Sequence, residues 1–184
     1  MTSEYGLEKK FCRIGEAVTL TEGCRIEGYA SLFGLTDKGG DVVMPGAYGK
    51  SLARLKAESR AVRMLWQHDA TQPIGVWDEI AEDGRGLRVK GRILTEIEKG
   101  RDAAALVAAG AIDGLSIGYR TVTAEKDAKG QRLLREVELW EVSLVTFPML
   151  PEARVSAKGE TLGAETLRDL AALFEEARRT LAGR

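Results

Sequence analysis

The sequence predicts an α+β fold, in which a small, mostly antiparallel β-barrel or curled sheet is surrounded by helices. Three observations lead to this prediction. Segments with alternating apolar and polar residues recur along the chain, and several are joined by short turns rich in Gly and Asp. Only two internal segments have helical periodicity. A third amphipathic segment lies at the C-terminus and is expected to form a helix outside the barrel.

Two strands are expected near the N-terminus, at residues 11–19 and 24–33. Apolar and polar residues roughly alternate in both, and the turn formers Glu22 and Gly23 lie between them. These features predict that the two strands are joined by a turn.

The first helix is expected to begin at Pro45, after a loop at residues 36–41 that is dense in turn-forming residues. The fixed φ of proline suits the first turn of a helix, where its missing N–H removes no hydrogen bond. Tyr48, Leu52 and Leu55 then repeat at helical spacing.

A short apolar run at residues 62–66 leads to His68, the one histidine of the chain. Residues 74–80 and 87–94 follow, and apolar residues alternate with charged ones in the second of these segments. The Gly- and Asp-rich residues 82–86 between them predict a β-hairpin.

A second helix is expected between Thr95 and Gly110. Thr95 and Glu98 have the spacing of a capping box, and Gly110 stands where a left-handed residue would end the helix. Residues 103–109 are small and favour a helix, so this helix can pack closely against a sheet.

Residues 117–123 and 133–147 are predicted to form a long hairpin around a turn at residues 127–130. Pro148 and Pro151 are expected to end it. Beyond this hairpin, the amphipathic segment has one apolar stripe, formed by Leu167, Leu170, Phe174, Ala177 and Leu181. The expected organisation is therefore one domain over residues 1–157 and a helical tail over residues 158–184.

The composition argues against several classes of function. A formal net charge of −1 gives no large basic field, so nucleic acid is not an expected partner. The first ten residues are polar and mixed in charge, unlike a signal peptide. No apolar run approaches the roughly 20 residues that cross a bilayer. We therefore expect a soluble, intracellular protein that does not bind membranes.

The metal-ligating residues are few. Two cysteines, Cys12 and Cys24, and a single histidine cannot supply the usual zinc spacings. No metal or other cofactor is expected. The two cysteines are expected to be reduced thiols, as in cytosolic proteins.

A candidate nucleophile, Ser116, lies between Gly114 and Gly118. This spelling matches the nucleophile elbow of α/β-hydrolases, which lies between a strand and a helix and precedes its acid and then its histidine. Here a helix is expected before the serine and a strand after it, and His68 comes earlier in the chain. The α/β-hydrolase interpretation is therefore rejected. Two glycines around a serine also describe an ordinary tight turn.

His68 and a carboxylate complete the candidate set. A mechanism that needs an imidazole near neutral pH must use His68, although a lone histidine can also simply pack at a strand end. Asp69 is a poor partner, because adjacent residues of an extended chain point to opposite faces. Glu141 and Glu138 lie on opposite faces of one predicted strand, and an arginine salt bridge is the alternative role for either.

Four ordered blocks of sequence carry a resemblance to a known family. They are residues 39–47 (GGDVVMPGA), 65–68 (LWQH), 114–119 (GLSIGY) and 141–148 (EVSLVTFP). In this order and spacing they resemble the prohead proteases of tailed phages, over about residues 28–157. That family is similar in fold to herpesvirus capsid-assembly proteases, which are serine proteases built on a closed β-barrel surrounded by helices.

The resemblance implies roles for three residues. Ser116 would be the nucleophile and His68 the general base, and Glu141 would be the third member of the triad, where the herpesvirus enzymes have a histidine. The implied substrates are the scaffolding segment of the major capsid protein, inside a procapsid in the bacterial cytoplasm, and the protease itself. The C-terminal helix would pack on the barrel, or dock on a scaffold or a second protease copy.

Two other hypotheses remain open from the sequence. A non-catalytic, protease-like internal scaffold would keep the fold without the chemistry. A small esterase would use the same three side chains on another acyl substrate.

Overall fold

The computed structural model describes residues 8–12, 24–37 and 39–147, and for residues 8–12 it describes the backbone alone. These residues form eight strands and two helices. The strands are β1 (Glu8–Cys12), β2 (Arg25–Leu32), β3 (Asp41–Val43), β4 (Arg63–Trp66), β5 (Asp69–Glu82), β6 (Gly86–Ile93), β7 (Gly114–Lys126) and β8 (Arg132–Val145). The helices are α1 (Gly49–Ala57) and α2 (Glu98–Ala108).

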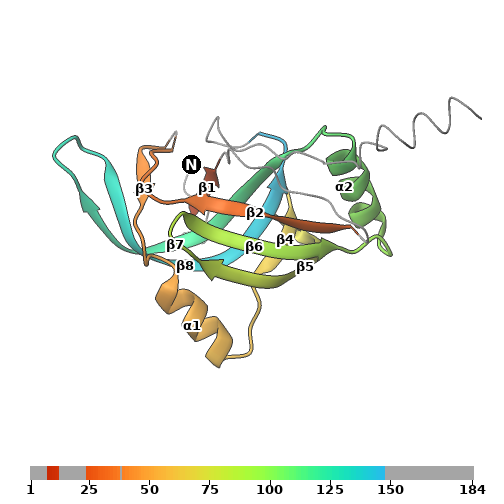
Figure 1. The fold of residues 1–184 in the computed structure, drawn as a ribbon, viewed down its shortest axis with the longest axis horizontal. Helices are drawn as coiled ribbons and strands as arrows, with labels where there is room; N and C mark the ends of the chain where they lie inside the picture. The colour runs from red at the N-terminus through yellow and green to blue at the C-terminus, as the bar shows by residue number, and fades with distance from the viewer. Residues whose placement is uncertain (1–7, 13–23, 38, 148–184) are drawn as a thin grey trace, which may run out of the picture.

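All eight strands belong to one curled, mixed sheet in the order β1-β7-β8-β4-β5-β6-β2, with β3 added beside β8 (Figure 1). Strands β3 and β4 run parallel to β8, and the other pairs are antiparallel. The sheet curls until β2 lies beside β1 and β7, but no hydrogen-bonded ladder joins these edges within the described residues. Of the two forms expected from the sequence, a β-barrel or a curled sheet, the described residues have the curled sheet, which forms a half-barrel.

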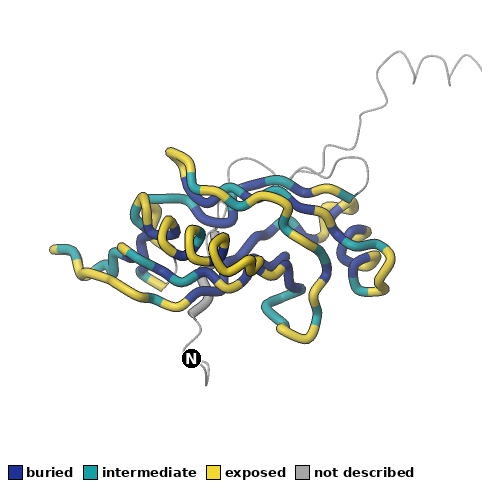
Figure 2. Tube along the Cα trace, turned by 90° about the horizontal axis from the view of Figure 1, so that it is seen from below, coloured by how far each residue is buried: buried dark blue, intermediate teal, exposed yellow. Residues whose placement is uncertain are grey.

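The core fills the inside of the curled sheet. Buried segments run along the strands, and exposed residues gather at the loop ends (Figure 2). Tyr48 and Tyr119 are the largest fully buried side chains, and they pack with Met64, Ile117 and Leu139 in one hydrophobic cluster. Burial of this apolar surface, at about 25 cal/mol per Å², drives the sheet to curl around its own side chains.

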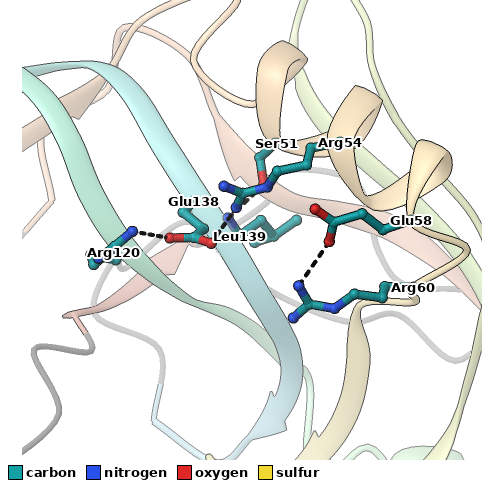
Figure 3. Close-up of polar contacts among 7 residues, drawn as sticks. All are labelled: Ser51, Arg54, Glu58, Arg60, Arg120, Glu138 and Leu139. Atoms are coloured by element: carbon teal, nitrogen blue, oxygen red, sulfur yellow. Dashed lines mark hydrogen bonds and ion pairs between the residues drawn. The ribbon is translucent and has the colours of Figure 1, made fainter.

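Helix α1 is held against β8 by polar contacts from one buried and one exposed side chain of the helix. The Ser51 hydroxyl oxygen accepts a hydrogen bond of 2.9 Å from the Leu139 backbone N–H. Arg54 pairs with Glu138, which also accepts a hydrogen bond from Arg120 (Figure 3). Strand β8 has no strand neighbour on that side between its pairings with β3 and β4, and helix α1 contacts β8 there instead.

Several predicted elements are confirmed. The segment before His68 is β4, and the two hairpins after it are β5–β6 and β7–β8. Gly110 ends the second helix with a φ of 69°, and Gly130 turns the second hairpin with a φ of 81°. These positions were predictable because a left-handed φ favours glycine over all other residues.

Other elements differ from the prediction. Helix α1 begins at Gly49 because the chain from Pro45 to Tyr48 forms turns. Helix α2 begins after Ile97 without a side-chain cap, so the capping box of Thr95 is wrong. Strand β2 pairs with β6, while β1 pairs with β7, so the first two strands are not hydrogen-bonded to each other. Residues 13–19 of the first predicted strand and the C-terminal helix lie outside the described residues.

Replacing Ser51 by alanine should lower the free energy of unfolding by about 1–3 kcal/mol, because the Leu139 N–H would remain buried without an acceptor. Urea unfolding followed by circular dichroism measures this loss. The control is Lys56→Ala on the exposed side of the same helix, for which a change within about 0.5 kcal/mol is expected. Equal losses of unfolding free energy in the two variants would show that the hydrogen bond from Leu139 to Ser51 does not stabilise the fold.

Candidate active site

The sheet brings Ser116 and Glu141 to one place. In the antiparallel β7–β8 pair, Ser116 is opposite Ser143 and Gly118 is opposite Glu141. Alternate residues of a strand share a face, so Ser116 and Gly118 look toward the same side as Glu141 and Ser143. Strand β4 pairs with β8 from the other side, with Arg63 opposite Glu141.

His68 reaches this face through a tight turn at the end of β4. Trp66 pairs with Asp69, so Gln67 and His68 are the two central residues of a hairpin turn, with φ values of 53° and 63°. Two-residue hairpins favour positive φ at both positions, but residues other than Gly, Asn and Asp adopt it at a cost. Gln67 holds the turn in place by donating a 2.6 Å hydrogen bond to the Thr146 hydroxyl.

The three candidate side chains form one hydrogen-bonded line. Ser116 Oγ lies 2.6 Å from His68 Nε2, and His68 Nδ1 lies 2.5 Å from Glu141 Oε1. An ionised carboxylate only accepts hydrogen bonds, so the neutral imidazole carries its proton on Nδ1 and donates it to Glu141. Its Nε2 is then free to accept the Ser116 hydroxyl proton. The side chains of His68 and Glu141 are 4% and 5% exposed, and Ser116 is fully buried.

Two further residues fix the Glu141 carboxylate, and the sequence did not single them out for this role. The Ser143 hydroxyl donates a hydrogen bond to Glu141 Oε2, which leaves Oε1 for the imidazole. Gly118 makes room for the carboxylate, because a Cβ at this position would lie 2.2 Å from Oε1. The second glycine of the Gly-x-Ser-x-Gly motif therefore accommodates the acid instead of shaping a turn.

Asp69 does not take part in this line. Its carboxylate accepts hydrogen bonds from the hydroxyl and the backbone N–H of Thr71 and from the side chain of Gln72. The hydrogen bond from the Thr71 hydroxyl lowers the pKa of Asp69 below its usual value. Asp69 thus shapes the start of β5, as its position next to His68 suggested.

Glu138 lies on the same face of β8 as Glu141, because the register shift at Trp140 interrupts the alternation, and its role is structural. The opposite faces expected for the two glutamates are therefore wrong. Burial raises the pKa of Glu138, but the hydrogen bond from Arg120 and the nearby charges of Arg54 and Arg120 outweigh this, so this pKa lies below its usual value. Glu138 is therefore an ionised partner of two arginines (Figure 3). The arginine salt bridge expected for one of the two glutamates is confirmed for Glu138, with Arg120 as one partner.

Neither a metal cluster nor a membrane helix is found in the described part of the chain. Within residues 8–12, 24–37 and 39–147, no group of three or more His, Cys, Asp or Glu side chains is placed to hold a metal ion. Over the same residues, no helix has the length and apolar character needed to span a membrane.

A serine, an imidazole and a carboxylate joined in this order have the arrangement of an acyl-transfer site of the serine-hydrolase class. Comparison with known proteins gives the family. A family model described as caudovirus prohead serine protease matches residues 14–167. The chain belongs to this family of phage capsid-maturation proteases.

A relative found by sequence comparison supports this family assignment. The prohead protease of Enterobacteria phage HK97 is 34% identical over 147 residues, a match that covers 78% of this chain and 64% of that protein. The chain thus spans a little less than two thirds of the length of this relative.

Among solved structures, the bacteriophage T4 capsid assembly protease matches with a TM-score of 0.60 at 19% identity, over 77% of this chain and 98% of that one. The two proteins share a fold. The varicella-zoster virus protease matches with a TM-score of 0.42 at 15% identity, over 83% of this chain and 76% of that one.

Replacing Gly118 by alanine should displace the Glu141 carboxylate from His68, because the new Cβ would overlap with Oε1. The chain has one histidine, so a single far-downfield proton resonance is expected in NMR spectra for the hydrogen-bonded Nδ1–H. We expect Gly118→Ala to remove or shift this resonance.

The matched control is Gly84→Ala in the β5–β6 loop, where an added Cβ meets no atom within 4 Å. This variant should keep the resonance of the wild-type protein. An unchanged resonance in Gly118→Ala would show that the Glu141 carboxylate keeps its hydrogen bond to His68 despite the added Cβ.

Proposed function

We propose that the protein is a serine endopeptidase that cleaves the scaffolding segment of the major capsid protein, and also itself, during procapsid maturation. It would act inside the procapsid, in the cytoplasm of the bacterial host. The observation that supports this proposal most directly is the continuous hydrogen-bonded line from Ser116 through His68 to Glu141. The prohead protease of phage HK97 and the capsid assembly protease of phage T4 support the capsid as the target.

In the proposed mechanism, the Ser116 oxygen attacks the carbonyl carbon of a substrate peptide bond while His68 Nε2 takes the hydroxyl proton. The tetrahedral intermediate collapses as the imidazolium passes this proton to the leaving amine, and an acyl-enzyme remains on Ser116. Water then attacks the acyl carbon while His68 Nε2 takes its proton. The ester bond to Ser116 breaks as the imidazolium returns this proton to the Ser116 oxygen, and the carboxylic acid leaves. Proton transfer of this kind contributes typically about 10²–10⁴-fold to a rate.

Glu141 would hold the imidazole in the tautomer that this sequence of steps needs, and it would stabilise the imidazolium that forms. Both side chains are almost completely buried, which strengthens their electrostatic interaction compared with one in water. Ser143 and Gly118 would support the role by keeping Oε1 directed at Nδ1.

Substrate access requires a change from this structure. Ser116 is 0% exposed, so a peptide bond reaches its hydroxyl only after part of the covering chain moves. The backbone of β1 lies beside β7 at this point, with Phe11 opposite Ser116.

This burial also favours a second candidate function, a non-catalytic internal scaffold in which the three residues only stabilise the sheet. A fluorophosphonate probe distinguishes the two functions, because it forms a bond only with an activated serine. Labelling of Ser116 would support the protease, and a protein that stays unlabelled while shells mature normally would support the scaffold.

Ser116→Ala should abolish cleavage of the co-expressed capsid protein, by about 10⁴-fold or more, because no other group would supply the nucleophile. Mass spectrometry of the co-expressed proteins measures the cut sites and any self-cleavage together. Ser31→Ala is the matched control, since Ser31 is also a buried strand serine and its hydroxyl has no hydrogen-bond partner among the residues that the structure describes. Normal capsid processing by Ser116→Ala would exclude Ser116 as the nucleophile.

The rate of cleavage should rise from mildly acidic to mildly alkaline pH, because only the neutral imidazole of His68 accepts the serine proton. Steady-state measurement of kcat/KM on one peptide over this range tests the prediction. The Ser31→Ala variant should give the same rise. A flat profile for the wild-type protein would argue against His68 as the base.

A further inference from the structure

A pocket of about 240 Å³ lies next to the candidate active site. His68 and Glu141 form part of its wall, and the rest comes from β8, β4, the start of β5, and the end of α1 with the loop that follows it. Ligand sites for whole drug-sized molecules measure about 300–1,000 Å³. The volume therefore suits one or two side chains of an extended polypeptide.

Three arginines line this pocket, and two of them are already paired. Arg54 pairs with Glu138, whose carboxylate also binds Arg120 outside the pocket lining. Arg60 pairs with Glu58 at 3.0 Å (Figure 3). Each of these two arginines therefore has a carboxylate of the protein as its ion-pair partner, and Arg54 shares that carboxylate with Arg120.

The third arginine, Arg63, has no such partner. Among the described residues, none makes an ion pair or hydrogen bond with its guanidinium group. Its neighbour across the β4–β8 pair is Glu141, but that carboxylate is directed at His68 and Ser143. Arg63 thus leaves one uncompensated positive charge in the lining of a pocket that reaches the imidazole.

Trp140 gives the same pocket an apolar wall. The register of β7 and β8 shifts here, because Gly118 pairs with Glu141 and Tyr119 with Leu139, so Trp140 is an extra residue in a β-bulge. Bulges near active sites redirect a side chain out of the regular pattern. Trp140 lines the pocket and remains 45% exposed, so its ring is available to pack against a bound segment.

We propose that this pocket is a subsite for an acidic side chain of the polypeptide substrate, bound by the guanidinium group of Arg63. Trp140 packs against the apolar part of the same segment. The proposal rests on the proposed function, since it assumes that a polypeptide is cleaved at Ser116. A planar guanidinium donates two parallel hydrogen bonds to a carboxylate, which makes an unpaired arginine a selective partner for Asp or Glu.

The first test uses the full-length wild-type chain. It is incubated with a mixture of peptides that covers all residue types, and mass spectrometry identifies the cut sites. We expect Asp and Glu to be enriched at one fixed position relative to the cleaved bond. Parallel labelling with a fluorophosphonate probe reports separately whether Ser116 is reactive.

The second test compares two peptides that differ only at the enriched position, one with Glu and one with Lys. Arg63→Gln should lower the kcat/KM ratio of the Glu peptide to the Lys peptide on the order of tenfold, through loss of charged hydrogen bonds. Arg63→Glu should change it on the order of 100-fold, because attraction becomes repulsion. Arg135→Glu is the matched control, an exposed arginine paired with Glu125 outside the pocket lining, and should leave the ratio unchanged.

Each outcome decides between the proposals. Cleavage without any acidic preference, or an unchanged ratio in both Arg63 variants, overturns the subsite and leaves the protease function standing. The wild-type peptide profile needs no variant, so it remains decisive even if Arg63→Glu fails to fold. A chain that neither cleaves peptides nor takes the probe overturns the proposed function, and the subsite with it.

Discussion

The parallel pairing of β4 with β8 is the constraint on which the rest of the site depends. It places Arg63 opposite Glu141, and the chain then needs only the turn after Trp66 to bring His68 back over the carboxylate. Parallel neighbours cannot be joined by a short turn, and here β5, β6, α2 and β7 come between them in the sequence. Strand β7, which carries Ser116, then pairs with the far edge of β8, so β8 lies between β7 and β4 in the sheet.

Each polar side chain of the candidate site has a hydrogen-bond partner within the site. Ser116, His68, Glu141 and Ser143 are buried, and each hydrogen-bonds to the next. Buried polar groups destabilise a protein unless they are paired, and a completed network is rigid. The network also requires Gly118, whose side chain makes no polar contact, because any larger side chain there would occupy the position of the carboxylate.

Sequence patterns predicted the hairpins and the glycine that ends α2, and the resemblance to the prohead proteases singled out the three residues of the candidate site. Patterns are weak where distant partners decide the structure, because alternation shows which residues share a face but not which strand lies beside them. The sequence therefore left open whether the curled sheet closes into a barrel, and it did not show that β2 pairs with β6. The turn at Gln67 and His68 was missed because it has positive φ without glycine or asparagine.

The order of the site residues along the chain also has a consequence for biosynthesis. The proposed base follows β4, the proposed nucleophile and acid are on β7 and β8, and β8 is the last strand of the described fold. A nascent polypeptide on the ribosome cannot orient the imidazole before β8 has emerged and inserted between its two neighbours. Folding itself would thus delay the assembly of the proposed triad, so that a half-made protease would pose no proteolytic hazard to the cell that produces it.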